Sequence, residues 1–189
     1  MKGNNIRKEL LSWFFVFVSG ITIALICREY IFSPVVVNGA SMSPTYENED
    51  VIIVSKISKI QRFDHIVFKA PYEDEYYIKR VIGLPGDTVE MKDDVLIING
   101  KEFEEPYVKR NAEYQIRMTE NFTLEDLTGE KKVPDGYIFV LGDNRLNSYD
   151  SRHYGLIPIE DVFGESKLRI YPLQNMKYFL IHMNKHVAK

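Results

Sequence analysis

A single uncharged segment near the N-terminus constrains this chain more than any other feature. Leu10 to Cys27 is a run of 18 residues without a charge, and Arg28 and Glu29 end it. As a helix this run is about 27 Å long, which is enough to cross the hydrocarbon core of a bilayer. A buried core helix is the weaker interpretation, because apolar residues surround the segment on nearly all sides. The sequence therefore predicts a membrane-spanning helix.

The flanking charges predict the orientation of this helix. It is preceded by three basic residues, Lys2, Arg7 and Lys8. By the positive-inside rule, residues 1–9 stay in the cytoplasm and the chain from residue 30 onward lies outside. A cleavable signal peptide is the alternative, but Cys27 is followed by Arg-Glu-Tyr and not by a small-residue cleavage site. We therefore expect a retained anchor at 10–27 and an extracytoplasmic domain at 30–172.

Composition argues against several other classes of protein. The 189 residues include 24 Lys and Arg against 27 Asp and Glu, without a dominant basic run, so nucleic acid is not an expected partner. Cys27 is the only cysteine, which excludes an internal disulfide. His182 and His186 are four residues apart but have no third ligand nearby, and the other histidines show no metal-ligand spacing. We expect neither a metal nor a cofactor.

From residue 33 the pattern changes to short runs of β-branched and aromatic residues separated by turn signals. The predicted strands are 35–37, 51–55, 65–69, 76–82, 87–91, 95–98, 137–141 and 167–171. Asn99-Gly100 predicts a tight hairpin. The polar residues 119–130 are predicted to form a loop or a short helical turn, and no longer helical pattern interrupts 33–171. The domain is therefore expected to be mainly β.

Residues 173–189 form a basic tail. Five apolar residues follow helical spacing in it, namely Met176, Phe179, Leu180, Met183 and Val187. Either this amphipathic tail packs on the domain as a helix or frays, or it touches the membrane surface. The first interpretation is the stronger one.

Two serines in the stretch NGASMSPTY, Ser41 and Ser43, are candidate nucleophiles. A serine hydroxyl needs a base to attack a carbonyl, and the usual base is a histidine with a carboxylate behind it. His153 is close to Asp150 in sequence, but its turn-like surroundings favour a surface position. The G-x-S-x-G and S-x-x-K patterns are both absent. The stretch alone is also compatible with a polar turn.

A neutral lysine is the other base that can activate a serine, and burial can lower a lysine pKa by several units. Lys79 is the best candidate because it lies inside the apolar run YYIKRVI. On a strand it shares a face with Tyr77 and Val81, and Arg80 points to the other side. From the pattern alone, a surface lysine on an edge strand is the stronger interpretation.

The segment GDNRLNSYDSR, residues 142–152, is dense in polar and charged side chains. Its two arginines, Arg145 and Arg152, can pair with Asp143 and Asp150 in a network that fixes a loop near a site. Ser148 can hold a neutral lysine amine in place. A plain loop can also have this composition.

These segments together resemble the bacterial type I signal peptidases, the membrane-bound serine–lysine family, in its short Gram-positive type. ASMSPTY resembles the S-M-x-P-T box, YIKRVIGLPGD the lysine box and DHIVFKAP the intervening strand. GDNRLNSYDSR matches G-D-N-R-x-x-S-x-D-S-R at every fixed position. The resemblance covers the chain from the anchor to about Pro172. It implies one transmembrane helix followed by an extracytoplasmic domain of antiparallel sheets.

The resemblance also implies roles for individual residues. Ser41 is the expected nucleophile and Lys79 the general base, and Ser148 is expected to hydrogen-bond the lysine amine. Four residues are expected to support the third box, namely Asp150, Arg152, Asp143 and Arg145. The Ser41 N–H is expected to donate to the oxyanion. Gly39 occupies the position where some members carry a serine hydroxyl, which leaves the second oxyanion donor open.

The implied function is a membrane-anchored serine endopeptidase that removes signal peptides from exported preproteins. Its partners would be those signal peptides, bound as an added strand, and the lipid bilayer. Small side chains before the cut would enter shallow pockets lined by four residues, Val35, Val37, Val67 and Ile78. Two alternatives are a non-cleaving β domain that binds peptides and a serine–lysine peptidase dedicated to one substrate.

Three positions depart from the usual pattern of the family. Tyr46 stands where leucine is common, His65 where an aliphatic residue is common, and Ala40 where a polar residue is frequent. None of these departures removes a catalytic group.

Overall fold

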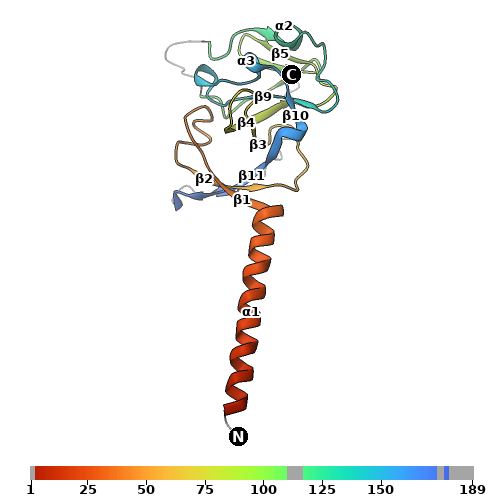
Figure 1. Cartoon of the computed structure of the whole chain (residues 1–189). Coiled ribbons are helices and arrows are strands. Elements are labelled where there is room, and N and C mark those ends of the chain that lie inside the picture. The colour runs from red at the N-terminus through yellow and green to blue at the C-terminus, as the bar shows by residue number, and fades with distance from the viewer. Residues whose placement is uncertain (1–2, 110–116, 174–176, 179–189) are drawn as a thin grey trace.

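The computed structural model describes residues 3–109, 117–173 and 177–178. Helix α1 (Gly3–Tyr30) projects as a single rod from a β domain that holds most of the other elements (Figure 1). Its large apolar side chains from Leu10 to Ile26 are exposed, for example Trp13 at 73% and Phe17 at 68%. Among the described residues, α1 is the one helix long and apolar enough to span a membrane. It extends beyond both ends of the predicted span 10–27.

The larger sheet follows the order β1-β2-β11-β3-β4-β9-β10, with β12 also paired to β11. Its strands are β1 (Phe32–Val36), β2 (Val51–Ser55), β3 (His65–Lys69), β4 (Tyr76–Gly83), β9 (Tyr137–Leu141), β10 (Ile157–Pro158), β11 (Val162–Tyr171) and β12 (Lys177–Tyr178). All of these pairings are antiparallel. The strand order places β4 inside the sheet and β1 at one edge.

A smaller antiparallel sheet lies at the end of the domain that is remote from α1 (Figure 1). It consists of β5 (Val89–Lys92), β6 (Val95–Ile98), β7 (Lys101–Phe103) and β8 (Phe122–Thr123). The predicted hairpin is confirmed, because Asn99 and Gly100 connect β6 to β7 with φ of 53° and 74°. Short helix α2 (Leu124–Thr128) follows β8 directly and is capped by Thr123.

The predicted mainly β domain of antiparallel sheets is confirmed. All eight predicted strands form, and β11 begins five residues before the predicted start of its strand. Four short strands, β7, β8, β10 and β12, were not predicted because two or three residues cannot display an alternating pattern. In the tail, residues 177–178 pair with β11, so the prediction of a helix is wrong for these two residues. The rest of the tail's predicted helical face lies outside the described residues.

Within the described residues, the apolar core falls into three clusters. One lies between the two sheets and includes Ile82 and Phe139. A second, which includes Met42 and Ile78, lies beneath the turn that follows β1. The third packs short helix α3 (Ser151–Tyr154) against the larger sheet through Tyr154. A short 3-10 turn, η1 (Arg145–Asn147), precedes α3.

Candidate active site

The fold brings Ser41 and Lys79 into contact, although 37 residues separate them in the sequence. The Lys79 Nζ lies 2.9 Å from the Ser41 Oγ. Lys79 is only 4% exposed, because β4 lies between β3 and β9 and not at an edge. The interpretation favoured by the pattern alone, a surface lysine on an edge strand, is therefore wrong. Strand order decided this point, and alternation within one strand does not reveal strand order.

The surroundings of Lys79 favour a neutral amine. Burial lowers its pKa from 10.5 to about 8, and the negative charge of Asp150 opposes this shift. The amine also lies 3.1 Å from the Ile78 carbonyl oxygen and 5.1 Å from the centre of the Tyr77 ring. No carboxylate pairs with it among the described residues. An amine of this kind can accept a proton from a hydroxyl at mildly alkaline pH.

Ser41 lies in a tight turn after β1, the segment 39–46, which we call the nucleophile turn. Gly39 begins it with φ of 86°, and its N–H donates to Asn48 Oδ1 at 2.9 Å. Ser43, the other candidate nucleophile, donates its hydroxyl to Glu47 at 2.8 Å and bonds no amine within the described part of the chain. Within the described residues the Ser41 N–H donates to no other group, which leaves it available to an oxyanion.

The segment 142–152 holds the nucleophile turn from one side. The Asn144 N–H donates to Ser41 O, and the Asn144 side chain donates to Ala40 O, both at 3.0 Å. Gly142 permits this close approach, because a Cβ there would lie 2.6 Å from Ser41 O and 2.1 Å from Ser148 Oγ. Such distances exclude any side chain at position 142 without movement of one neighbour.

Ser148 does not form the expected hydrogen bond to Lys79 in this structure. Its hydroxyl is buried against Gly142 and has no hydrogen-bond partner among the described residues. It lies near enough to Asp150 to help lower the pKa of that carboxyl, although the geometry falls short of a hydrogen bond. The Lys79 amine instead contacts Ser41 and the carbonyl of its own strand.

Asp150 and Arg152 form the expected pair within the segment 142–152. The Arg152 Nε lies 2.8 Å from Asp150 Oδ1, and the same carboxylate accepts from the Gly142 N–H at 3.0 Å. Burial alone would raise the pKa of Asp150, but the hydrogen bond and charge of Arg152 outweigh burial and hold the pKa below its ordinary value. The pair therefore keeps Gly142 and the start of α3 in place.

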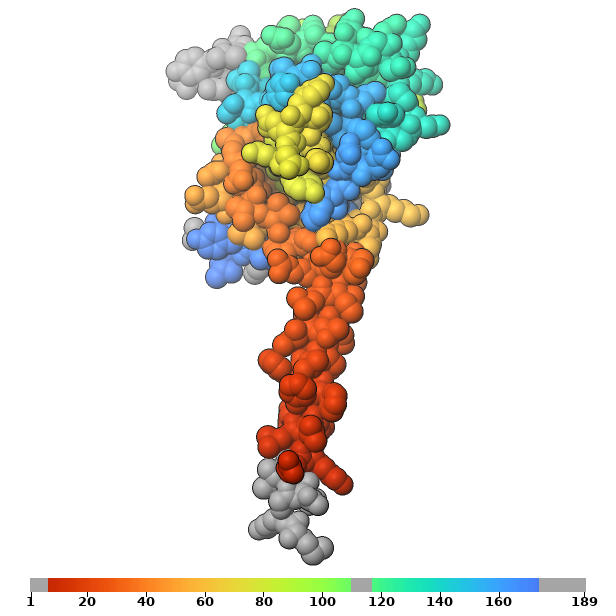
Figure 2. Space-filling model, in the orientation of Figure 1, coloured from red at the N-terminus to blue at the C-terminus, as the bar shows by residue number. Residues whose placement is uncertain are grey.

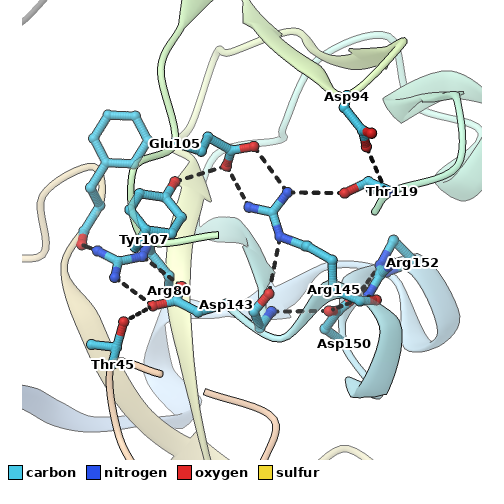
Figure 3. A network of polar contacts seen from close by, with 12 residues as sticks. Thr45, Arg80, Asp94, Glu105, Tyr107, Thr119, Asp143, Arg145, Asp150 and Arg152 are labelled. Atoms are coloured by element: carbon cyan, nitrogen blue, oxygen red, sulfur yellow. Dashed lines mark hydrogen bonds and ion pairs between the residues drawn. The ribbon is translucent and has the colours of Figure 1, made fainter. Parts of the chain in front are cut away.

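The other two charges of the segment pair elsewhere, which corrects the expected network. Asp143 accepts two hydrogen bonds from Arg80, at 2.8 Å to Nε and 2.6 Å to Nη2. It also accepts the hydroxyl proton of Thr45, so its carboxylate joins the residue after Lys79 to the nucleophile turn (Figure 3). Arg145 pairs with Glu105, which comes from outside the segment. Pattern reasoning missed Arg80 and Thr45, although a charge inside a buried strand is itself a signal that a carboxylate must lie nearby.

A cavity of about 240 Å³ adjoins the two candidate catalytic residues. Its lining includes all four predicted pocket residues, Val35, Val37, Val67 and Ile78, together with Ser41 and Lys79. The lining residues that were not predicted are Ile52, Tyr76, Tyr77, Asn147 and Tyr149, among others. On the molecular surface, the chain after β1 (orange) lies beside the yellow segment that leads into β4 (Figure 2). The aliphatic walls suit small apolar side chains.

Two of the three residues that depart from the family pattern, Tyr46 and His65, meet in the core. The Tyr46 hydroxyl lies 2.8 Å from Ser166 Oγ and 3.2 Å from His65 Nδ1. Burial lowers the pKa of His65 well below its ordinary value, and the charge of Arg80 adds to this effect. His65 is therefore neutral, and a polar contact replaces the apolar one that leucine and an aliphatic residue would make.

Comparison with known proteins adds an independent observation. The family model described as signal peptidase, peptidase S26, matches residues 10–171. Signal peptidase I of Bacillus caldolyticus is 46% identical over 157 residues, which cover 80% of this chain and 86% of that protein. Signal peptidase I S of Bacillus subtilis is 42% identical over 184 residues, covering 94% and 98% respectively. The crystal structure of a signal peptidase I from Enterococcus faecalis superposes with a TM-score of 0.55 at 46% identity, over 58% of this chain and 97% of that one.

Proposed function

This chain belongs to the signal peptidase family, peptidase S26, and we propose that Ser41 and Lys79 carry out its removal of signal peptides from exported preproteins. The observation that carries this proposal is the 2.9 Å contact between the Ser41 hydroxyl and a buried amine whose pKa is lowered to about 8. The enzyme is thus a serine endopeptidase that uses a lysine where other serine proteases use histidine.

In the first step, neutral Lys79 accepts the proton of the Ser41 hydroxyl as Oγ attacks the scissile carbonyl carbon. The Ser41 N–H donates to the oxyanion that forms. The Lys79 ammonium then gives its proton to the leaving amine, which departs as the N-terminus of the mature protein. A water molecule, deprotonated by Lys79, attacks the acyl ester and releases the signal peptide with a carboxylate end. Ser41 and neutral Lys79 are restored.

Three features support binding of an extended peptide beside this dyad. β1 occupies an edge of the larger sheet, and an edge offers unpaired backbone groups to an added strand. The cavity next to Ser41 has aliphatic walls, formed by residues such as Val37 and Ile78. Its volume of about 240 Å³ is enough for small side chains of an extended peptide. We propose that this cavity receives the small residues that precede the cut.

We propose that α1 anchors the enzyme with its N-terminus in the cytoplasm and its β domain outside. The basic residues that precede the apolar run support this orientation. β1 begins two residues after α1 ends, so the substrate edge is joined to the anchor almost directly. A substrate that is still held in the bilayer by its own apolar segment would present its cleavage site at the height of the active site above the bilayer.

Cleavage of a purified preprotein by matched variants tests the dyad. We expect Ser41→Ala and Lys79→Ala each to lower kcat by about 10³-fold or more, since removal of one partner of a catalytic pair disables both. Ser43→Ala is the matched control, because its hydroxyl bonds Glu47 and not Lys79. Undiminished cleavage by either dyad variant would refute the proposal. Binding of the peptide without turnover by the unmodified protein would favour a non-cleaving module.

A further inference from the structure

Two side chains outside the recognised boxes, one buried and one partly buried, together contact both ion pairs of the site. Glu105 and Tyr107 follow β7 of the smaller sheet, and Glu105 is only 6% exposed. In Figure 3 they lie between the Arg80–Asp143 pair on one side and Arg145 on the other. They therefore link the smaller sheet to the residues that surround the dyad.

Tyr107 covers the guanidinium of Arg80. The Arg80 Cζ lies 3.7 Å from the centre of the Tyr107 ring, within the range of a cation–π contact. The edge of the same guanidinium bonds Asp143 and the Phe63 carbonyl oxygen, the latter at 2.9 Å. The ring thus closes the remaining face of a cation that is 2% exposed. Without it, water or a new partner would reach Arg80.

Glu105 neutralises Arg145. One carboxylate oxygen lies 3.0 Å from Arg145 Nη1, and the other oxygen accepts from Nη2, so the pair is bidentate. The two side chains are 3% and 1% exposed. Tyr107 donates its hydroxyl to Glu105 at 2.8 Å. Burial, together with the Glu105 charge, raises the pKa of Tyr107 well above its ordinary value, so the phenol stays protonated as a donor.

Each arginine in turn holds a part of the dyad. Arg80 directly follows Lys79, and its partner Asp143 accepts from Thr45 in the nucleophile turn. The Arg145 Nε donates to the Gly142 carbonyl oxygen at 3.0 Å, beside the contact from Asn144 to the Ser41 carbonyl. The contacts of Arg80 and of Arg145 therefore both help to fix the distance between Ser41 Oγ and Lys79 Nζ. Neither Glu105 nor Tyr107 contacts the reacting atoms.

We propose that Glu105 and Tyr107 are positioning residues for signal-peptide cleavage, through which the smaller sheet sets the geometry of the Ser41–Lys79 dyad. This inference rests on the proposed function of the dyad. Its physical reason is the cost of a buried charge without a partner. A buried arginine that loses its carboxylate moves toward water or toward another carboxylate, and here the charge of Asp143 already acts on Arg145. Either movement would shift the segment 142–152 and misalign Ser41.

The test compares three variants of the full-length protein in the same preprotein cleavage assay. We expect Glu105→Gln and Tyr107→Leu to lower kcat by about 10- to 100-fold, since a misplacement of about 1 Å costs on that order. KM should stay within about threefold, because the cavity residues are unchanged. Tyr107→Phe keeps the ring over Arg80 and should retain at least about a third of the kcat.

A control variant separates positioning from stability. The Arg62–Asp87 pair, at 2.8 Å, also lies where the two sheets meet but does not contact the dyad network. Asp87→Asn should lower the melting temperature and leave kcat unchanged at a temperature where the protein is folded. A kcat equal to that of the parent in folded Tyr107→Leu or Glu105→Gln would overturn the inference. If Glu105→Gln does not fold, the Tyr107 variants decide. Activity in Ser41→Ala would instead refute the dyad itself, so the two failures are distinguishable.

Discussion

Lys79 and Arg80 are adjacent basic residues in one buried strand, yet their surroundings shift their pKa values in opposite directions. Arg80 meets the carboxylate of Asp143; although burial opposes the charge, this partner keeps the pKa of Arg80 above its ordinary value. Lys79 meets a hydroxyl and a carbonyl oxygen, so burial dominates and its pKa falls to about 8. Partner identity therefore makes one residue a structural charge and the other a candidate base.

The lowered pKa of Lys79 predicts the pH dependence of cleavage. Only the neutral amine can accept the serine proton, so activity should fall as pH drops below the pKa of about 8. We expect kcat/KM to rise about tenfold per pH unit below that value and to level off above it. A peptide cleavage assay between about pH 5 and 10 measures this. A profile that stays flat down to about pH 5 would contradict Lys79 as the base.

Replacement of Gly142 by alanine is expected to lower kcat severely, although alanine has the smallest side chain. In Gly142→Ala the new Cβ would lie 2.1 Å from Ser148 Oγ and 2.6 Å from Ser41 O, so the nucleophile turn must move. We expect kcat to fall by about 10²-fold, because a misplacement of the nucleophile by about 1 Å costs on that order. Gly100→Ala is the control, since its Cβ meets open space at a turn with φ of 74°. It should lower stability by about 1 kcal/mol and leave kcat unchanged. Equal kcat losses in the two variants would count against the close-approach argument.

At the scale of elements, α1 and β4 show how differently two apolar runs can be used. The side chains of α1 are exposed from Leu10 at 64% to Ile26 at 51%, so the β domain leaves the apolar surface of this helix uncovered. β4 has neighbours on both edges, and its residues from Ile78 to Gly83 are all buried. Composition alone does not distinguish a membrane helix from a core strand, but run length does.

The orientation of α1 can be tested by labelling in intact cells. In a Cys27→Ser background, a cysteine at position 72, where Tyr72 is 77% exposed, should react with a membrane-impermeant maleimide. A cysteine that replaces Lys8 should react only after lysis, because the basic N-terminus stays inside. Labelling of the position-8 cysteine in intact cells would reverse the proposed topology. A cytoplasmic protein serves as the control for cell integrity.

At the scale of the whole molecule, the domain combines apolar clusters with an unusual number of buried charges. The pairs Arg80–Asp143, Arg145–Glu105 and Arg169–Asp50 all have side chains no more than 5% exposed. Buried pairs of this kind contribute little net stability but make the loss of one partner costly. They therefore favour one arrangement of the two sheets over others.

The buried carboxyl of Asp64 is expected to lower the stability of the folded state at neutral pH. Burial raises the pKa of Asp64 from 3.8 to about 6, and Glu165 adds to this although the Gln61 N–H opposes it. The folded state therefore binds more protons than the unfolded state between these values, and stability is lost as pH rises through about 6.

Asp64→Asn should remove this effect, because an amide oxygen can still accept from Gln61. We expect the melting temperature to rise by about 2–4 °C at pH 8 and to change little at pH 4, where Asp64 is already protonated. Thermal melts at both pH values check this, with the exposed Asp135→Asn as control. An equal shift at both pH values would mean that titration of Asp64 is not the cause.

Local chemistry determined a large part of this protein. An uncharged run of 18 residues can only be stable when something apolar surrounds it, and alternating β-branched residues specify strands wherever they occur. The same local reasoning drew attention to the stretch that contains Ser41 and Ser43, the segment 142–152 and the hairpin at Asn99-Gly100, and the family resemblance chose Ser41. These features depend on residues that are close together in the chain.

Only the tertiary structure decided which groups face each other across the sheets. Whether Lys79 is buried depends on the strands that flank β4, and these come from residues 65–69 and 137–141. Arg145 pairs with Glu105, 40 residues away, and Asp143 with Arg80, 63 residues away. The first pair depends on how the two sheets pack, and the second on the pairing of β4 with β9, and both are set by the packing of the core as a whole. A pKa and a catalytic distance depend on that packing, and no short stretch of sequence contains it.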